Sequence, residues 1–128
     1  ISFENVSLKF ENSHDYQLKD INFKVKKGEF IAVIGSSGSG KSTLMKVLMR
    51  LYTPNQGLVK IDKNDINKFD LYSLRNQIGF VPQETLLFSG TIQSNISLPK
   101  PEASFEEIRE AARVANADDF IQSILDPQ

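Results

Sequence analysis

One segment constrains the fold of this chain more than any other. Residues 35–42 match the phosphate-binding loop G-x-x-x-x-G-K-[ST] at every fixed position. The apolar run 30–34 before the loop is typical of a short strand that is buried on both faces of a parallel sheet. After the loop, four apolar residues share one face of a helix that Pro54 prevents from continuing: Leu44, Val47, Leu48 and Leu51. This order of strand, loop and helix predicts that the chain binds a nucleoside triphosphate.

The residue types of the loop fit the chemistry of phosphate. Its glycines are predicted to allow backbone conformations closed to other residues, so that several N–H groups point toward one anion. A helix that begins near Gly40 adds free N–H groups and the positive end of its dipole. Lys41 supplies a full charge for the β- and γ-phosphates, Ser42 is a ligand suited to Mg²⁺, and Thr43 can reach a phosphate oxygen. The predicted binding residues are Gly35, Ser36, Ser37, Gly38, Ser39, Gly40, Lys41, Ser42 and Thr43.

Composition excludes several other classes of function. The 128 residues are enough for one small domain, and the net charge of −1 gives no basic field, so a nucleic-acid partner is not predicted. No apolar run approaches the roughly 20 residues needed to cross a bilayer, and the chain is expected to be soluble as it stands. The sequence contains no cysteine, which excludes disulfides and thiolate metal sites. Affinity for phosphate must therefore come from the loop.

The chain starts without a methionine and directly in a strand pattern, so we expect it to be part of a longer protein. Residues 1–34 are predicted to form antiparallel strands that lead into the sheet carrying the loop. Residues 58–61 and 78–81 are predicted strands, and a short helix is expected around residues 71–75. Pro82 ends the last of these strands.

The last third of the chain is predicted to be helical. Ser104 and Glu107 have the spacing of a capping box, and they precede an apolar stripe typical of a helix. Asp118 and Asp119 are expected to cap another short helix. The predicted division is a partial core at residues 1–82 and the start of a helical part at residues 83–128.

A second specific pattern lies at residues 80–96, where Phe-Val-Pro-Gln is followed by Phe-Ser-Gly-Thr-Ile-x-x-Asn-Ile. This pattern resembles the Q-loop of ATP-binding cassette (ABC) transporters, and its continuation is similar to the exporter branch. Residues 18–23 and the pair Leu74-Arg75 also resemble that family. The resemblance implies an α/β fold: a P-loop NTPase core with a parallel sheet, an antiparallel β subdomain and the start of an α-helical subdomain. The chain is then the first part of a nucleotide-binding domain.

In that family the glutamine at the position of Gln83 acts as a hinge and sensor. An amide suits the role, because its carbonyl can ligate Mg²⁺ or hold the attacking water while its NH₂ group donates to phosphate. The resemblance thus implies ATP and Mg²⁺ as cofactors, Lys41 and Gln83 as catalytic residues, and Ser42 and Gln83 as metal ligands. Taken without the resemblance, Gln83 could equally be a surface glutamine.

Phe10 lies where the family usually has an aromatic residue that stacks on adenine, and a phenyl ring can stack as well. A plain core role for Phe10 stays open because it continues the alternation of Val6 and Leu8, and Tyr16 is a second candidate for the stacking residue. His14 is expected to be solvated.

Three aspartates could be taken for a metal cluster, but their irregular spacing in a polar loop favours solvated carboxylates: Asp62, Asp65 and Asp70. Asp126 invites comparison with the family's second metal-binding motif, yet only two apolar residues precede it and Pro127 follows, so we reject that interpretation. A GTPase would also show Asp-x-x-Gly and Asn-Lys-x-Asp. Neither is expected in this chain, since residues 62–65 resemble the second motif only superficially.

The resemblance implies partners and a place in the cell. The segment after Gln83 is expected to face the coupling helices of a transmembrane domain, and a second nucleotide-binding domain is expected to complete each ATP site head to tail. This places the parent protein on the cytoplasmic face of the cell membrane, where it couples ATP hydrolysis to export. The family's Leu-Ser-Gly-Gly-Gln motif, its Mg²⁺-binding Asp with the catalytic Glu, and its switch His are not found in these 128 residues. We therefore expect the chain alone to bind ATP weakly at best and not to hydrolyse it. A non-hydrolysing binding module and a non-transport ABC ATPase remain alternatives.

Overall fold

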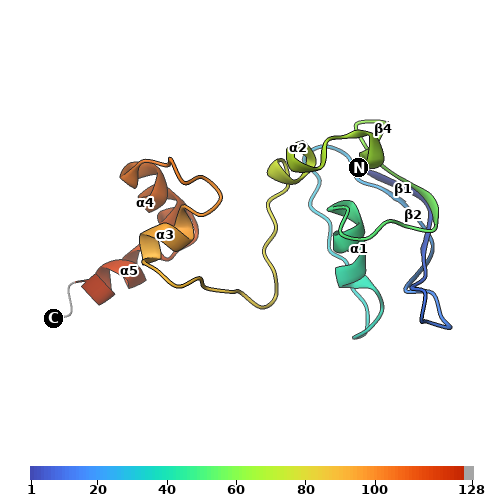
Figure 1. Cartoon of the computed structure of the whole chain (residues 1–128), viewed down its shortest axis with the longest axis horizontal. Coiled ribbons are helices and arrows are strands. Elements are labelled where there is room, and N and C mark those ends of the chain that lie inside the picture. Colours follow the sequence, from blue (N-terminus) through green and yellow to red (C-terminus); the bar gives the residue numbers. More distant parts are fainter. Residues whose placement is uncertain (126–128) are drawn as a thin grey trace. The chain divides into compact units, whose positions relative to one another are not determined.

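The computed structural model describes residues 1–125 of the chain. It divides into two compact units, Ile1–Phe80 and Val81–Gln128, which are called unit 1 and unit 2 below. Unit 1 is a mixed α/β unit and unit 2 is helical (Figure 1). Each unit is described by itself.

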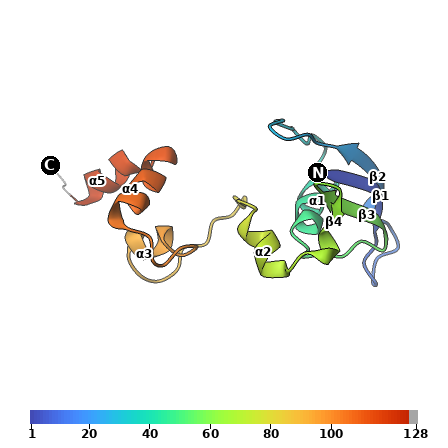
Figure 2. The same ribbon diagram turned by 90° about the horizontal axis from the view of Figure 1, so that it is seen from above.

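Unit 1 is built on a four-stranded antiparallel sheet in the order β2-β1-β3-β4 (Figure 2). The strands are β1 (Ser2–Leu8), β2 (Leu18–Lys24), β3 (Gln56–Ile61) and β4 (Asn64–Asp65). Central strand β1 pairs with both β2 and β3. The sequence predicted antiparallel strands for β1 and β2, because apolar and polar residues alternate along them, and it predicted a strand at residues 58–61 within β3. Strand β4 was not predicted.

A bulge in β1 explains why the alternation shifts between Phe3 and Val6. The register with both neighbouring strands slips there, and Asn5 takes a left-handed backbone conformation with φ 51°. The Asn5 N–H donates to the Asn22 side chain at 2.8 Å, which replaces a ladder bond. The extra residue turns Phe3, Val6 and Leu8 to the same face of the sheet, and all three are buried.

Helix α1 (Lys41–Leu48) packs against that face through its apolar stripe. Val47 is fully buried and Leu44 nearly so, which confirms the helix predicted after the loop, although it ends at Leu48 rather than extending to Leu51. The short 3-10 helix η1 (Ile66–Lys68) and helix α2 (Leu71–Asn76) close the core with Ile66 and Leu74.

Unit 2 consists of helices α3 (Ile92–Ile96), α4 (Phe105–Val114) and α5 (Asp118–Leu125). The predicted capping box forms at α4: the Ser104 hydroxyl accepts the Glu107 N–H at 3.2 Å, and the Glu107 carboxylate accepts the Ser104 N–H at 2.8 Å. The expectation that Asp118 and Asp119 cap α5 is corrected: both lie within its first turn, where acidic residues favour the helix. None of the described helices is long and apolar enough to cross a membrane.

Two predicted strands are not formed in the described residues. Residues 30–34 and 78–81 have no regular secondary structure, so these two strand predictions are wrong for the chain as it stands. Phe30 and Ile34 are 95% and 93% exposed, whereas Ile31 and Val33 between them are 50% and 46% exposed. The segment keeps the two-sided alternation of a strand, but no neighbouring backbone supplies the ladder of hydrogen bonds that makes a strand.

Candidate nucleotide-binding site

The phosphate-loop candidate is held in its path by Gly40, which caps the start of α1. Gly40 has φ 90°, and Gly38 has φ 79°, both in the left-handed region that disfavours residues with a Cβ. A Cβ on Gly40 would lie 2.6 Å from the Gln17 carbonyl oxygen and 2.9 Å from Leu18 Cδ2. Glycine is therefore required at this position for two independent reasons. Gly35, in contrast, has no left-handed φ, which corrects the expectation that all three loop glycines need special backbone angles.

Lys41 folds its ammonium group back over the loop. Its Nζ donates to the carbonyl oxygens of Gly35 and Ser36 at 2.8 and 2.6 Å, and to the Ser39 hydroxyl at 3.3 Å. These three acceptors are neutral, so no carboxylate cancels the charge of Lys41 in this loop. The positive charge is thus placed at the centre of the loop, where an anion would gain most from it.

The amino end of α1 offers backbone donors to the same place. No side chain caps the helix at Gly40, and its first turn holds no acidic residue. The N–H groups of a first helical turn have no partner within the helix, and together with the helix dipole they favour an anion. Ser42 is exposed and Thr43 is half-buried, so both hydroxyls stand at this end of the helix. The residues predicted from Gly35 to Thr43 are all in one exposed loop and the helix start that follows it.

The aromatic candidates lie beyond the end of β1. Phe10 is 36% exposed and stacks edge-on against Tyr52, with ring centroids 5.0 Å apart and planes at 74°. Because Val6 and Leu8 are buried while Phe10 is not, a plain core role for Phe10 is wrong. Tyr16 is 44% exposed with the Lys9 ammonium 5.8 Å from its ring centre. Both rings therefore keep an accessible surface.

Gln83 lies in unit 2, in an exposed bend that precedes an extended exposed stretch. The large apolar side chains that follow Gln83 are exposed to solvent: Leu86 is 80%, Leu87 82% and Phe88 59% exposed. A run of three exposed apolar residues is unusual on the surface of a soluble protein and is typical of an interaction surface.

Asn95 gives this stretch a defined end, a role that the sequence alone did not reveal. Its Oδ1 accepts the Phe88 N–H at 2.8 Å, and its Nδ2 donates to the carbonyls of Phe88 and Thr91 at 2.9 Å each. Ser94 and Thr91 form a second capping box at the start of α3. Asparagine meets three backbone groups at once. An apolar side chain would remove the partner of the Phe88 N–H and carbonyl, whereas the Thr91 carbonyl would still accept from the Ser94 hydroxyl at 2.9 Å.

The acidic residues considered as metal ligands have local roles. Asp65 caps η1 by accepting the Asn67 N–H at 2.9 Å, and Asp70 caps α2 by accepting the Ser73 N–H at 2.9 Å. The Ser73 N–H bond lowers the pKa of Asp70 below its ordinary value. Asp62 lies in the tight turn between β3 and β4 with φ 48°. Within residues 1–125 no three acidic or histidine side chains come together as a metal site, His14 is exposed, and Asp126 lies outside the described residues.

One of the two GTPase motifs does occur, which corrects the expectation that both are missing. Residues 67–70 are Asn-Lys-Phe-Asp and match Asn-Lys-x-Asp. The Asn67 N–H donates to Asp65, which caps η1, and the Asp70 carboxylate caps α2. These bonds give the four residues a structural explanation. With Asp-x-x-Gly missing from the chain, they do not indicate a GTPase.

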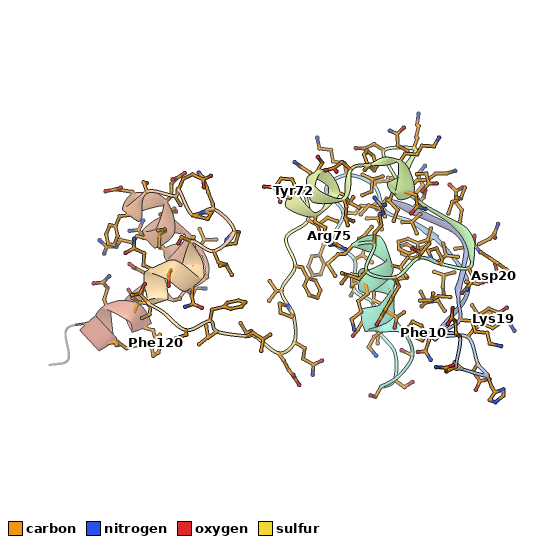
Figure 3. All side chains as sticks on the ribbon, in the orientation of Figure 1. Phe10, Lys19, Asp20, Tyr72, Arg75 and Phe120 are labelled. Atoms are coloured by element: carbon orange, nitrogen blue, oxygen red, sulfur yellow. The ribbon has the colours of Figure 1, made fainter. Side chains whose placement is uncertain are left out.

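Two arginines join the far end of α1 to the segment 69–75. Arg75, which is labelled in Figure 3, donates from Nε to the Met49 carbonyl at 3.1 Å and from Nη2 to the Arg50 carbonyl at 3.2 Å. Arg50 donates in return from Nη1 to the Phe69 carbonyl at 2.7 Å. The sequence showed Leu74-Arg75 only as part of a family pattern, since nothing in the spacing of Arg50 and Arg75 reveals that they meet.

Comparison with known proteins identifies the class. The sequence profile of the family described as ABC transporter matches residues 18–126, and the chain belongs to this family. The match covers the phosphate loop and Gln83 together, the two features on which the resemblance was based.

Relatives and a solved structure narrow the comparison. The chain is 47% identical over 123 residues to YgaD of Bacillus subtilis (strain 168), which carries the name of a multidrug export ATP-binding/permease protein. It is 45% identical over 124 residues to a protein of the same description, SAV1866, from Staphylococcus aureus (strain Mu50 / ATCC 700699). These alignments cover 96% and 97% of this chain but 21% and 22% of the relatives. The chain thus spans about a fifth of the length of the curated relatives it matches.

A solved structure gives the same answer for the fold. The chain resembles a bacterial Atm1-family ABC exporter with ATP bound, with a TM-score of 0.89 and 38% sequence identity. The comparison covers 94% of this chain and 21% of that one. The fold of the described residues is therefore that of part of an ABC exporter.

Proposed function

We propose that this chain is the ATP-binding portion of an ABC exporter's nucleotide-binding domain, in a parent protein that couples ATP binding and hydrolysis to export across a membrane. The observation that supports it most directly is the phosphate loop. There the Lys41 ammonium, the left-handed glycines and the start of α1, which no side chain caps, lie together in one segment. The names of the relatives support the transport part of the proposal.

Each site residue then has a physical task. The backbone N–H groups of residues 36–43 donate to phosphate oxygens, and Lys41 exchanges its carbonyl partners for the β- and γ-phosphates. Ser42 and Gln83 are oxygen ligands of the kind that Mg²⁺ prefers, and the bound ion would neutralise charge that builds up on the γ-phosphate. Gln83 also orients the attacking water through its amide, without titrating. Phe10 is the proposed stacking partner of adenine.

The incomplete sheet fits the same proposal. We propose that residues 30–34 and 78–81 become strands of a parallel sheet in the complete domain, giving the P-loop NTPase core. Two features of residues 30–34 support this: all five side chains are apolar, and their exposure alternates as it does along a strand. A strand with apolar side chains on both faces is suited to the middle of a sheet. In this proposal the core comprises residues 1–82 and the helical subdomain starts at residue 83.

The partners follow from the exposed apolar stretch after Gln83. Leu86, Leu87 and Phe88 supply an apolar surface that we assign to contact with the coupling helices of the transmembrane domain. A second nucleotide-binding domain, arranged head to tail, would bring the signature motif to this ATP. The complete protein then works at the cytoplasmic face of the membrane.

Replacing Lys41 tests the nucleotide site. Lys41→Ala in the complete polypeptide should lower ATP affinity by roughly 10- to 100-fold, the value of a charge-assisted contact. Lys46→Ala is the matched control, because Lys46 lies on the same helix with its ammonium 5.7 Å from the Tyr52 ring centre, away from the loop. Isothermal titration with ATP and Mg²⁺ measures both. Equal loss in the two variants would contradict the assignment.

A second candidate is a nucleotide-binding module that does not turn over by itself. It is favoured by one observation: the signature motif, the catalytic Glu and the switch His of the family are not among these residues. For the isolated 128-residue chain we expect weak ATP binding and no hydrolysis above background. An ATPase assay with the Lys41→Ala variant decides this, and hydrolysis that depends on Lys41 in the isolated chain would refute it.

A further inference from the structure

Arg50 and Arg75 join the carboxyl end of α1 to the segment 69–75 by side-chain hydrogen bonds that run in both directions. Arg75 holds two carbonyl oxygens at the end of α1, and Arg50 at that same end holds the Phe69 carbonyl just before α2. These two residues are called the arginine clamp below. The bonds run in both directions, so a shift of either segment would strain both side chains.

The residue types in the clamp are not those that local structure prefers. Arg50 has φ 52°, a left-handed conformation in which glycine would be more favourable. The bonds from Arg50 N–H to the Val47 carbonyl at 2.9 Å and from Leu51 N–H to the Lys46 carbonyl at 2.8 Å are the usual backbone ending of such a helix. Since the backbone ends the helix without help, the side chain of Arg50 is needed for something else. Its bond to Phe69 is that use.

Arg75 is also more than a charge. Its planar fork donates to the carbonyls of Met49 and Arg50 at once, which the single ammonium of a lysine cannot do in the same geometry. The positive group lies at the negative end of the α1 dipole, where it is favourable. Apolar packing by Leu74 already fixes α2 to the core, so the clamp adds direction rather than attachment.

The backbone of Arg75 continues toward Gln83. The Ile78 N–H donates to the Arg75 carbonyl at 3.1 Å, and Ile78 packs half-buried against the core of unit 1. The chain leaves unit 1 two residues later, and Gln83 follows three residues after Phe80. Through one residue, the end of the phosphate-loop helix is therefore tied to the turn from which the Gln83 segment departs.

We propose that Arg75, with Arg50, is a positioning residue for ATP hydrolysis: the clamp fixes residues 69–78, from which the chain continues to Gln83, to the carboxyl end of the phosphate-loop helix. This rests on the function proposed above. Nucleotide binds at the amino end of α1, whose loop bonds do not involve either arginine. The clamp should consequently affect the rate of hydrolysis far more than the affinity for ATP.

A double-mutant cycle with Gln83 tests the proposal in the complete polypeptide. Arg75→Met should lower kcat on the order of tenfold or more while KM for ATP changes less than about threefold. Each rate of hydrolysis is normalised to the amount of nucleotide bound per chain, so that a misfolded fraction of the protein is not mistaken for a lower kcat. In the Gln83→Ala background the same change should cost less than about twofold, because the two residues act as one unit. Arg75→Lys should restore part of the rate.

The controls separate positioning from stability. Lys68→Met removes an exposed cation of the same region and should leave kcat and KM unchanged. Arg50→Gly removes the bond to Phe69 while relieving the left-handed backbone, and it should reproduce the loss of kcat; it decides the question if Arg75→Met does not fold.

Three outcomes overturn the inference. The first is an unchanged kcat in both arginine variants, and the second is a rise in KM as large as the fall in kcat. The third is a fall in kcat from Arg75→Met that is as large in the Gln83→Ala background as in the unaltered protein. If the unaltered protein shows no hydrolysis that depends on Lys41, the proposed function itself fails and the clamp proposal falls with it.

Discussion

Unit 1 and unit 2 are stabilised in different ways. Ten of the twelve buried apolar side chains among the described residues belong to unit 1, and unit 2 contributes only Ile108 and Ala112. Unit 2 relies instead on local bonds: capping boxes at α3 and α4, and the Asn95 side chain. Unit 1 is thus specified by contacts between distant residues, and unit 2 mostly by contacts between neighbours.

The two units also differ in charge. Residues 1–80 carry 12 Lys and Arg against 8 Asp and Glu, whereas residues 81–125 carry 3 against 7. The net charge of −1 for the whole chain conceals this division. The phosphate loop lies in the basic unit, so the field around it favours an anion even though the chain as a whole is slightly acidic.

The largest expected effect comes from the core of unit 1. Ile66→Ala should lower the free energy of unfolding of unit 1 by about 2–5 kcal/mol, because it removes a side chain that is 2% exposed and leaves a cavity. Amide hydrogen exchange read separately for residues 1–80 and 81–125 measures it. Leu86→Ala, at an 80% exposed position, should stay within about 0.5 kcal/mol. Equal loss of protection in both units after Ile66→Ala would show that they unfold together and would end the distinction.

The next effect tests the loop within unit 1. Gly40→Ala should cost about 1–3 kcal/mol, since alanine must take a left-handed conformation and meet the Gln17 carbonyl. Gly28→Ala is a matched control: Gly28 has φ 81°, but a Cβ there meets nothing within 4 Å. The difference between the two variants in thermal unfolding of unit 1 isolates the clash. No difference would mean that the contact with Gln17 is not kept in solution.

Removing a cap tests the local stability of unit 2. Ser104→Ala should destabilise α4 by about 1 kcal/mol, because the Glu107 N–H loses its acceptor. Amides in the first turn of α4 should exchange faster, while those of unit 1 should not change. Ser97→Ala, outside the box, is the control. Unchanged exchange in the first turn of α4 would show that α4 depends on packing and not on its cap.

The smallest effect is a dependence on pH. The Glu107 carboxylate accepts a hydrogen bond from Lys100 at 2.6 Å and a second one from the Ser104 N–H, and these bonds lower the pKa of Glu107. The bond between Lys100 and Glu107 also raises the pKa of Lys100. A carboxyl whose pKa is lower in the folded state stabilises that state fully above its unfolded pKa of about 4.3 and loses this contribution as pH falls through the lowered value. Acidification should therefore loosen the start of α4.

The Lys100→Met variant checks the cause of that shift. Without the ammonium, the pKa of Glu107 should move up toward its ordinary value in a carbon-detected NMR titration. The pKa of Asp70, which is lowered by the Ser73 N–H in unit 1, should not move and provides the internal reference. A Glu107 pKa that does not respond to Lys100→Met would refute the ion pair as its cause.

Local patterns predicted most of the regular structure. The alternation in residues 1–8 and 18–24, the stripe behind α1, and the box at Ser104 each depend on residues close in sequence, and each forms. Helix α3 lies in the third of the chain that was predicted to be helical, but it was not predicted as a separate helix, because Ser94 takes the place of the Glu or Gln that usually marks a capping box. The strands at 30–34 and 78–81 did not form, because a strand requires a partner that its own sequence cannot provide.

The candidate site divides along the same line. By itself the sequence determined the phosphate loop, its lysine and the helix that starts behind it, because eight adjacent residues contain nearly all the information. Only the tertiary structure decided that Gly40 lies against Gln17, that Phe10 packs on Tyr52 and stays exposed, and that Arg50 and Arg75 bind each other's segments. The physical reason is distance along the chain: the clamp joins residues 19 to 26 positions apart, and no local pattern records which of them will meet.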